Sequence, residues 1–236
     1  MIDLAIINGI TGKGPLQAEI RIPPMDQIQL RPNVIFDIAY DKRVVHLGCT
    51  DHLSIIDQKV KSGVLLHQQL TRIAAACLGV DINREATRLL RRLGITNIIV
   101  ADITQPDIPD ICNNEWDFLL MAEMLEHIDD PVAFLKCIAL HYREQLKNLI
   151  ITVPNAFGFV QMAQVFYHGT ESINHDHRYW FTPYTLCKVA HQAGLVLDDL
   201  IMCVYENSVG MLKDHRDTLS DKPILLDTIV LVAHWK

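Results

Sequence analysis

From Arg43 onward, short apolar runs alternate with helical segments, and this alternation constrains the fold more than any other feature of the sequence. The first run, Val44 to Leu47, ends at Gly48 and has the nearly continuous apolar character of a strand buried on both faces. Crossover helices must pack back on such a sheet, so the pattern predicts a doubly wound α/β fold with a mostly parallel, Rossmann-like sheet. Further parallel strands are predicted at 78–82, 98–101, 116–122 and 149–153.

Helices are predicted between these strands from apolar periodicity and from residues that begin or end helices. One helical stretch covers 63–77, where apolar residues recur at helical intervals. Gly94 supplies a left-handed residue that ends a helix over 84–93. Helix starts are predicted at Asn83, at Asp130 with Pro131, and at Thr182 with Pro183.

The two ends of the chain differ from this central pattern. Apolar residues recur at every second position around TGKGP, which predicts a β-hairpin in an N-terminal extension over residues 1–42, followed by an α/β domain over 43–236. At the other end, 201–205 and 228–233 are predicted to form an antiparallel hairpin at the sheet edge. The alternating residues of the N-terminal hairpin are Ile2, Leu4, Ile6, Ala18, Ile20 and Ile22.

Composition excludes several classes of protein. The chain of 236 residues carries 21 Lys and Arg against 28 Asp and Glu, and this acidic balance argues against a protein that binds nucleic acid through clustered cations. The one basic cluster, Arg88, Arg91 and Arg92, has the spacing of a solvated helix face. No apolar run approaches the ~20 residues of a membrane span, and the first residues lack the basic region of a signal peptide. The six scattered cysteines predict reduced thiols in a cytoplasmic protein.

Ligands of open α/β sheets bind at the carboxyl ends of the strands, so the residues that follow each strand are the candidate binding residues. Asp81 can accept hydrogen bonds from both hydroxyls of a ribose, or can serve as a carboxylate at a helix N-terminus. Asp102 can accept from an adenine amino group, or can cap the next turn. Gly48, after the first strand, is a third candidate, because a residue without a side chain lets the backbone approach a ligand closely, although a glycine that merely ends a strand is the alternative. Suitable residues at three successive strand ends favour a nucleoside pocket. The full candidate set is Gly48, Cys49, Thr50, Asp81, Ile82, Asp102, Ile103, Ala122 and Glu123.

Six segments follow one another along the chain: VVHLGCTDH, LGVDI, IIVADIT, FLLMAEMLEHIDDP, LIITVPN and HRYWFTPYTLCKVAHQAGL. As an ordered set they resemble the class I S-adenosylmethionine-dependent methyltransferases. The MLEHIDDP and WFTPYTL pieces are most similar to the small-molecule branch, which includes the ubiquinone-pathway O-methyltransferases and relatives associated with surface polysaccharides. The resemblance spans roughly residues 43–205 and implies S-adenosylmethionine as cofactor. It also implies the family's sheet, which ends in an antiparallel hairpin.

The resemblance implies a role for each candidate residue. Gly48 and Cys49 would lie against the methionine part, and Asp81 would bind the ribose hydroxyls. Ile82 would pack on the adenine, Asp102 and the Ile103 backbone would bind its edge, and the Ala122 carbonyl would face the amino group. The chain departs from the family at His46, usually acidic, and at Thr50 and His52, usually glycine. Either Glu123 or a backbone carbonyl binds the ammonium group instead, or cofactor binding is weak or absent. The segment between Gly48 and Asp81 is longer than the roughly 20 residues of a dinucleotide fingerprint, and 51–63 is predicted to form a flap. The LGCTDH turn after the first strand lacks the G-x-G-x-x-G glycines that let a backbone bind a pyrophosphate, which argues against a nicotinamide dehydrogenase.

Methyl transfer depends mainly on alignment, and a general base is needed only where the acceptor holds its proton tightly. His177 in the NHDHRYW segment is the candidate base, with His175 and Tyr179 nearby; a purely structural role for each is the alternative. Glu123, Glu126 and His127, followed by His175 and His177, resemble the magnesium motif of small-RNA 2′-O-methyltransferases. The interpretation favoured from the sequence is that Glu126 and His127 cap the turn before Asp130, with Mg²⁺ as the alternative.

The sequence therefore predicts a methyltransferase that acts on a small-molecule acceptor, at oxygen, without nucleic-acid or membrane partners. The exposed strand at the end of the chain permits a homodimer. The alternative is a non-catalytic protein of the same fold that serves as a binding or scaffold module.

Overall fold

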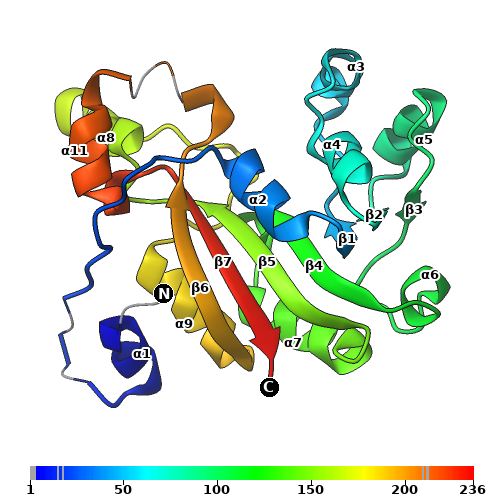
Figure 1. Cartoon of the computed structure of the whole chain (residues 1–236), viewed down its shortest axis with the longest axis horizontal. Coiled ribbons are helices and arrows are strands. Elements are labelled where there is room, and N and C mark those ends of the chain that lie inside the picture. Colours follow the sequence, from blue (N-terminus) through cyan, green and yellow to red (C-terminus); the bar gives the residue numbers. More distant parts are fainter. Residues whose placement is uncertain (1–3, 15, 18, 209, 211–212) are drawn as a thin grey trace.

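The structure is a computed structural model that describes residues 4–14, 16–17, 19–208, 210 and 213–236. Within these residues the centre of the molecule is a seven-stranded sheet in the order β3-β2-β1-β4-β5-β7-β6 (Figure 1). The strands β1 to β5 run parallel, and β7 lies antiparallel between β5 and β6. This arrangement confirms the predicted doubly wound fold and its C-terminal antiparallel pair. The strands are β1 (Arg43–Leu47), β2 (Ala76–Asp81), β3 (Ile98–Val100), β4 (Trp116–Ala122), β5 (Leu146–Pro154), β6 (Leu195–Cys203) and β7 (Thr228–Trp235).

Helices cover the sheet and its ends (Figure 1). The α-helices are α1 (Leu4–Thr11), α2 (Arg31–Ala39), α3 (Leu53–Ser62), α4 (Leu66–Ile73), α5 (Arg84–Arg92), α6 (Pro109–Cys112), α7 (Pro131–Tyr142), α8 (Phe159–His168), α9 (Pro183–Gln192) and α11 (Arg216–Asp221). Short 3-10 turns include η1 (Leu125–His127) and η2 (Glu206–Ser208). None of the helices within the described residues is long and apolar enough to cross a membrane.

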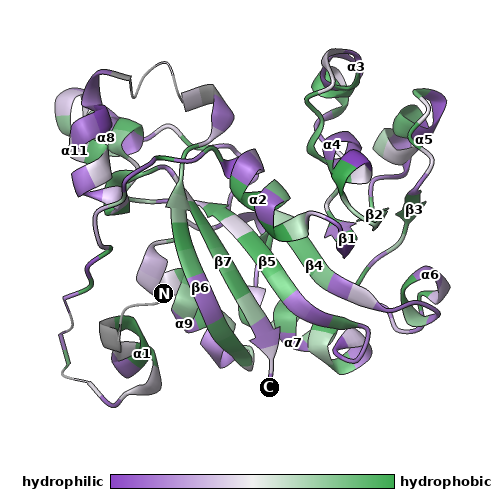
Figure 2. Ribbon diagram, in the orientation of Figure 1, coloured by the Kyte–Doolittle hydropathy of each residue, from purple (hydrophilic) through white to green (hydrophobic). Residues whose placement is uncertain are grey.

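Both faces of the sheet are buried, which explains the continuous apolar runs in the sequence. Successive residues of a strand point to opposite faces. Val44 packs in one core cluster with α2 and α4, whereas its neighbour Val45 packs in the other with α7 and α9. The same alternation holds for Leu119 and Leu120 in β4. The hydrophobic colour of β5 and β7 in Figure 2 follows from this burial on two sides.

The predicted helix ends are confirmed. The Asn83 side chain accepts hydrogen bonds from the Glu85 and Ala86 amides at the start of α5, and Gly94 has φ +90° beyond its end. Asp130 caps α7, and Thr182 caps α9 in a capping box. The helix predicted over 63–77 is shorter, because residues 76 and 77 pair with β1 as part of β2. Gly63, at φ +73°, separates α3 from α4.

The predicted N-terminal β-hairpin, and with it the N-terminal β extension, is wrong. Leu4–Thr11 forms α1, because Ile6 and Ile10 are spaced by one helical turn and both are buried on the cluster that includes α9. Ile20 and Ile22 pack on the core from an irregular segment without a partner strand. Ile2 and Ala18 lie outside the described residues.

Helix α2 is missed by sequence reasoning, and Pro32 in its first turn is the residue that argues against a helix there. Proline is compatible with the first turn of a helix, where its missing N–H costs nothing. The α2 residues Val34, Ile35 and Ala39 are buried against the sheet. The division of the chain into an extension over 1–42 and a domain over 43–236 stays a prediction.

Candidate active site

A pocket of about 650 Å³ opens at the carboxyl ends of β1 and β4. These two strands are neighbours in the sheet, and the chain leaves β1 toward β2 on one side and β4 toward β5 on the other. Such a switch point is where open α/β sheets bind ligands. The wall includes residues 48–53, 55 and 59, so the predicted flap is helical α3 and does border the pocket.

The turn after β1 depends on Gly48. Its φ is +66°, and a Cβ placed there would lie 3.2 Å from the Met124 side chain. The next residue, Cys49, is 1% exposed, and burial raises the pKa of its thiol far above the usual range. The thiol therefore stays protonated and fills space rather than acting as a nucleophile.

The Asp81 carboxylate is held by the two loops that follow β1 and β2. Its Oδ2 accepts the Thr50 amide at 3.0 Å and the Thr50 hydroxyl at 2.8 Å, while Oδ1 accepts the Asn83 amide at 2.8 Å. Thr50 and Asn83 line the pocket, whereas Asp81 is 8% exposed and lies behind them. Asp81 thus fixes the shape of this wall in addition to any role toward a ligand.

The other residues predicted to contact adenine lie outside the pocket wall. Asp102 Oδ1 accepts both the amide and the hydroxyl of Thr104, which is the turn-capping alternative. Ile103 is buried in the core, and Ile82 is 72% exposed. Contact between these residues and adenine stays a prediction.

Arg31, the first residue of α2, enters the pocket and was missed by sequence reasoning. Its amide donates to the Val204 carbonyl at 2.8 Å, which joins α2 to the end of β6. The guanidinium Nη2 lies 2.8 Å from Glu206 Oε1 and Nη1 lies 3.7 Å from Glu123 Oε1, and the group stacks 4.5 Å from the Tyr205 ring centroid. Burial lowers its pKa, but Glu123 and Glu206 outweigh this effect and the net shift is upward. Nothing local in QLRPNV signals this contact.

Ala122 and Glu123 line the pocket, and their contact with a cofactor stays a prediction. Glu123 has φ +52°, a left-handed conformation that costs a residue with a side chain about 1 kcal/mol or more and is typical of functional sites. The Thr152 hydroxyl donates to Glu123 Oε1 at 2.8 Å. Burial raises the pKa of Glu123, and Arg31 opposes that shift.

His46, in place of the acidic residue that the family usually has, is 3% exposed and lines the pocket. Its ring centroid lies 5.5 Å from that of His67. Burial, then His67 and Arg31, lower the pKa of His46 well below its ordinary value. The position therefore carries a neutral ring beside the Arg31 cation.

Glu126, His127 and His177 converge, with ligand atoms that all lie within 4.8 Å of one another. The His127 and His177 rings meet edge to face at 4.7 Å, and His127 Nε2 lies 3.9 Å from Glu126 Oε1. Both carboxylate oxygens of Glu126 and Nδ1 of His177 are buried without a hydrogen-bond partner among the described residues. The interpretation of Glu126 as a turn cap is therefore wrong.

Electrostatics set the protonation of this cluster. Burial, and then Glu123, raise the pKa of Glu126 to about 9. Burial, and then His127, lower the pKa of His177. At neutral pH the cluster therefore offers a protonated carboxyl and a neutral imidazole. Glu123 does not join it, because that carboxylate faces Arg31 instead.

The two residues after His177 bind to residues of η1 and the turn that follows it, which lie far away in the sequence. The Arg178 amide donates to the Glu126 carbonyl at 2.8 Å, and its Nε lies 2.6 Å from Asp129 Oδ1. The Tyr179 hydroxyl donates to the Asp129 carbonyl, so it is not free to act as a base. His175 pairs with Asp176 and is 87% exposed at its side chain, away from the cluster.

Comparison with known proteins gives a consistent result. Residues 28–200 match a family described as a methyltransferase domain. A ubiquinone biosynthesis O-methyltransferase of Aeromonas salmonicida is 25% identical over 172 residues, which cover 68% of this chain and 66% of the relative. A protein of the same name from Cupriavidus pinatubonensis is 24% identical over 202 residues, which cover 79% and 80%. The chain thus spans slightly less than two thirds of the first of these relatives.

Solved structures share the fold. An S-adenosylmethionine-dependent methyltransferase from Mesorhizobium loti aligns with a TM-score of 0.51 at 11% identity, over 86% of this chain and 95% of that one. The small RNA methyltransferase HEN1 aligns with a TM-score of 0.54 at 15% identity, over 94% of this chain and 28% of that one.

Proposed function

The chain belongs to the class I S-adenosylmethionine-dependent methyltransferase family, and from that premise we propose that it transfers a methyl group to an oxygen atom of a small-molecule acceptor. The names of the relatives support oxygen as the acceptor atom and a small molecule as the acceptor. The acidic net charge of −7 supports an acceptor other than nucleic acid.

One observation supports the proposal most: the same pocket combines an acceptor for a hydroxyl of a nucleoside with a pair of opposite charges that suits an amino acid. Behind one wall, formed by Thr50 and Asn83, the Asp81 carboxylate keeps an acceptor position that can bind a hydroxyl of a nucleoside. Arg31 and Glu123 line the same pocket with opposite charges, as the carboxylate and ammonium of an amino acid require. S-adenosylmethionine joins a nucleoside to an amino acid, and when bound it supplies an electrophilic methyl group on a sulfonium.

Within this family function we propose that His177 is the general base. Its lowered pKa keeps the imidazole neutral at pH 7, and its Nδ1 has no hydrogen-bond partner among the described residues. The acceptor hydroxyl would transfer its proton to this ring as the new C–O bond forms and the C–S bond breaks. Arg31 and Glu123 would contribute by orienting the amino-acid portion, which aligns the methyl group for displacement.

A divalent cation at Glu126, His127 and His177 is a second candidate role, and it rests on the unpartnered Glu126 oxygens. Two imidazoles beside one carboxylate suit a divalent first-row transition-metal ion, for which Mn²⁺ is the probe, better than Mg²⁺, which prefers an all-oxygen shell. In this role His177 is a ligand and cannot act as the base. Activity of the EDTA-treated protein with and without added Mn²⁺ distinguishes the two roles: stimulation that Glu126→Gln abolishes favours the cation.

The first experiment is a thermal melt with S-adenosylmethionine and with S-adenosylhomocysteine. A ligand at 100 times its Kd adds about 2.7 kcal/mol, which corresponds to roughly 5 to 10 °C for a chain of this size. Asp81→Ala should weaken binding by roughly 1 to 3 kcal/mol. The matched control Asp57→Ala, which removes a surface ion pair with Lys61, should leave binding unchanged. If neither ligand shifts the melt, the non-catalytic binding or scaffold role replaces the enzyme proposal.

A further inference from the structure

The hydrogen bonds of Asp81 leave little room for a ligand. An ionised carboxylate offers about four acceptor positions. The Thr50 amide and hydroxyl take both positions on Oδ2, and the Asn83 amide takes one on Oδ1. One position on Oδ1 remains, whereas a ribose presents two neighbouring hydroxyls.

Thr50 also covers Asp81. The threonine lines the pocket, while the aspartate behind it is 8% exposed. A glycine at this position would have no side chain to cover the carboxylate. The hydroxyl of Thr50 therefore occupies, within the protein, the place that a ligand hydroxyl would take on Oδ2.

Two contacts anchor the backbone around Thr50, which leaves the side chain as the part that can uncover the carboxylate. The Thr50 amide donates to Asp81 Oδ2, and the next residue, Asp51, forms an ion pair with Lys59 of α3. Rotation about χ1 carries the threonine hydroxyl between staggered positions without moving the backbone.

We propose that Thr50 is a gate on Asp81 that limits cofactor affinity by competing with one ribose hydroxyl. One ribose hydroxyl bonds to the open position on Oδ1, and the second reaches Oδ2 only after the Thr50 side chain rotates away. Thr50 thus determines how the nucleoside is recognised. The inference rests on the proposed function, since it concerns the same site.

Thr50→Val tests the gate, because valine keeps the shape and β-branching of threonine and removes the hydroxyl. Titration calorimetry with S-adenosylhomocysteine should show about tenfold tighter binding to Thr50→Val than to the parent, the scale of one hydrogen bond to a charged group. Thr50→Ser keeps the hydroxyl and should bind within about twofold of the parent. Melting curves without ligand establish that each variant is folded.

The 2′-deoxy and 3′-deoxy analogues of S-adenosylhomocysteine give an independent readout. The parent should bind one of the two as well as the intact ligand, because the ribose hydroxyl that reaches Oδ2 there only replaces the hydrogen bond of the Thr50 hydroxyl. Thr50→Val should bind both analogues about tenfold more weakly than the intact ligand.

The outcomes separate the gate from the function. Weaker or unchanged binding of S-adenosylhomocysteine by Thr50→Val, with binding by the parent that Asp81→Ala weakens, overturns the gate and leaves the function intact. Weaker binding would mean that Thr50 relays a hydrogen bond to the ribose instead. Absence of binding by the parent and by Thr50→Val overturns both proposals.

Discussion

The two ends of the pocket are built in different ways. The β2 end, formed by Thr50, Asp81 and Asn83, comes from two loops that follow neighbouring strands, and its carboxylate accepts three hydrogen bonds. The acidic end, formed by Arg31, Glu123, Glu126, His127 and His177, comes from α2, the end of β4, η1 and the segment before α9. Its buried polar atoms are partly unpartnered among the described residues.

The two ends differ in how well their buried polar groups are hydrogen-bonded. At the β2 end, satisfied hydrogen bonds keep the carboxylate in place at little cost. At the acidic end, Glu126 is buried without a hydrogen-bond partner from the described chain, beside Glu123 in a left-handed conformation. Groups arranged in this way are costly to the fold and therefore typical of sites that act on a ligand.

The largest expected loss of stability comes from a substitution at the acidic end. Arg31→Ala removes the buried cation that faces Glu123 and Glu206, and leaves those carboxylates uncompensated. We expect a loss of about 3 kcal/mol in the free energy of unfolding, measured by urea denaturation. The control Arg88→Ala, an exposed position on α5, should change stability by less than about 0.5 kcal/mol. Equal small changes in both variants would mean that Arg31 does not hold this end together.

The second prediction concerns pH. The Glu126 carboxyl, with a pKa of about 9 in the folded protein, stays protonated while its unfolded counterpart ionises near pH 4.5. Between these values the unfolded state binds fewer protons, so stability falls as pH rises, by at most about 1.4 kcal/mol per pH unit. Glu126→Gln cannot ionise and should flatten this dependence.

Unfolding free energies at about pH 5.5 and about pH 8, in EDTA, measure the effect. The control Glu144→Gln changes an exposed carboxylate and should keep the slope of the parent. A slope that Glu126→Gln leaves unaltered would contradict the buried, protonated carboxyl. Added Mn²⁺ should reverse the trend if the cation binds, because its ligands must lose their protons.

The third prediction sharpens the contrast at the β2 end. Asn83→Ala removes the side chain that accepts two amides at the start of α5, and should cost about 1 kcal/mol, or roughly 2 to 4 °C in Tm. Asn83→Asp keeps the cap and should lie within a few tenths of a kcal/mol of the parent. A thermal melt checks both variants, and equal losses in the two would show that the cap is not the cause.

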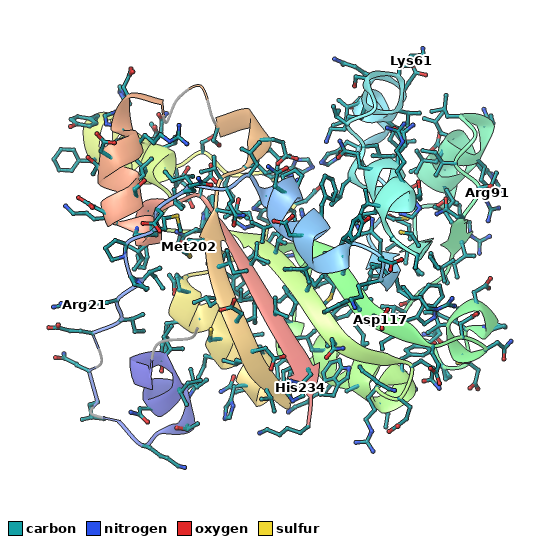
Figure 3. The ribbon with its side chains drawn as sticks, in the orientation of Figure 1. Arg21, Lys61, Arg91, Asp117, Met202 and His234 are labelled. Atoms are coloured by element: carbon teal, nitrogen blue, oxygen red, sulfur yellow. The ribbon has the colours of Figure 1, made fainter. Side chains whose placement is uncertain are left out.

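The smallest expected change in stability is that of Asp129→Ala, for which we also expect a lower kcat. Asp129→Ala removes an exposed partner of Arg178 and should cost less than about 1 kcal/mol. Because Arg178 and Tyr179 hold the His177 segment on η1, we expect kcat to fall roughly tenfold while the Kd for S-adenosylhomocysteine stays the same. Asp198→Ala, which loses a similar surface pair with His234 far from the pocket, is the control and should keep kcat (Figure 3). An unchanged kcat in Asp129→Ala would remove the positioning role.

The sequence alone determined the parallel sheet with its antiparallel pair, the capped starts of α5, α7 and α9, and the turn at Gly48 beside the pocket. The reason is that these features follow from short-range patterns: apolar runs buried on two faces, caps such as Asn83, and a turn at Gly48. The prediction of an N-terminal hairpin is wrong for a related reason. The spacing of Leu4 and Ile6 fits the alternating apolar pattern of a strand as well as it fits one face of a helix. Only the burial of Ile6 and Ile10 together decided for α1.

Only the tertiary structure decided the acidic end. Arg31 reaches Glu123 and Glu206 across large separations in the sequence, and His177 rather than His175 joins Glu126 and His127. No local pattern encodes these contacts, because they depend on where separate elements end after the sheet has formed. The sequence motif with Glu123, Glu126 and His127 indicated which residue types to expect. The packing of α2 and of the segment before α9 determines which of these side chains, together with Arg31 and His177, line one pocket. Charge pairing and burial act through space, whereas caps and strand patterns act along the chain.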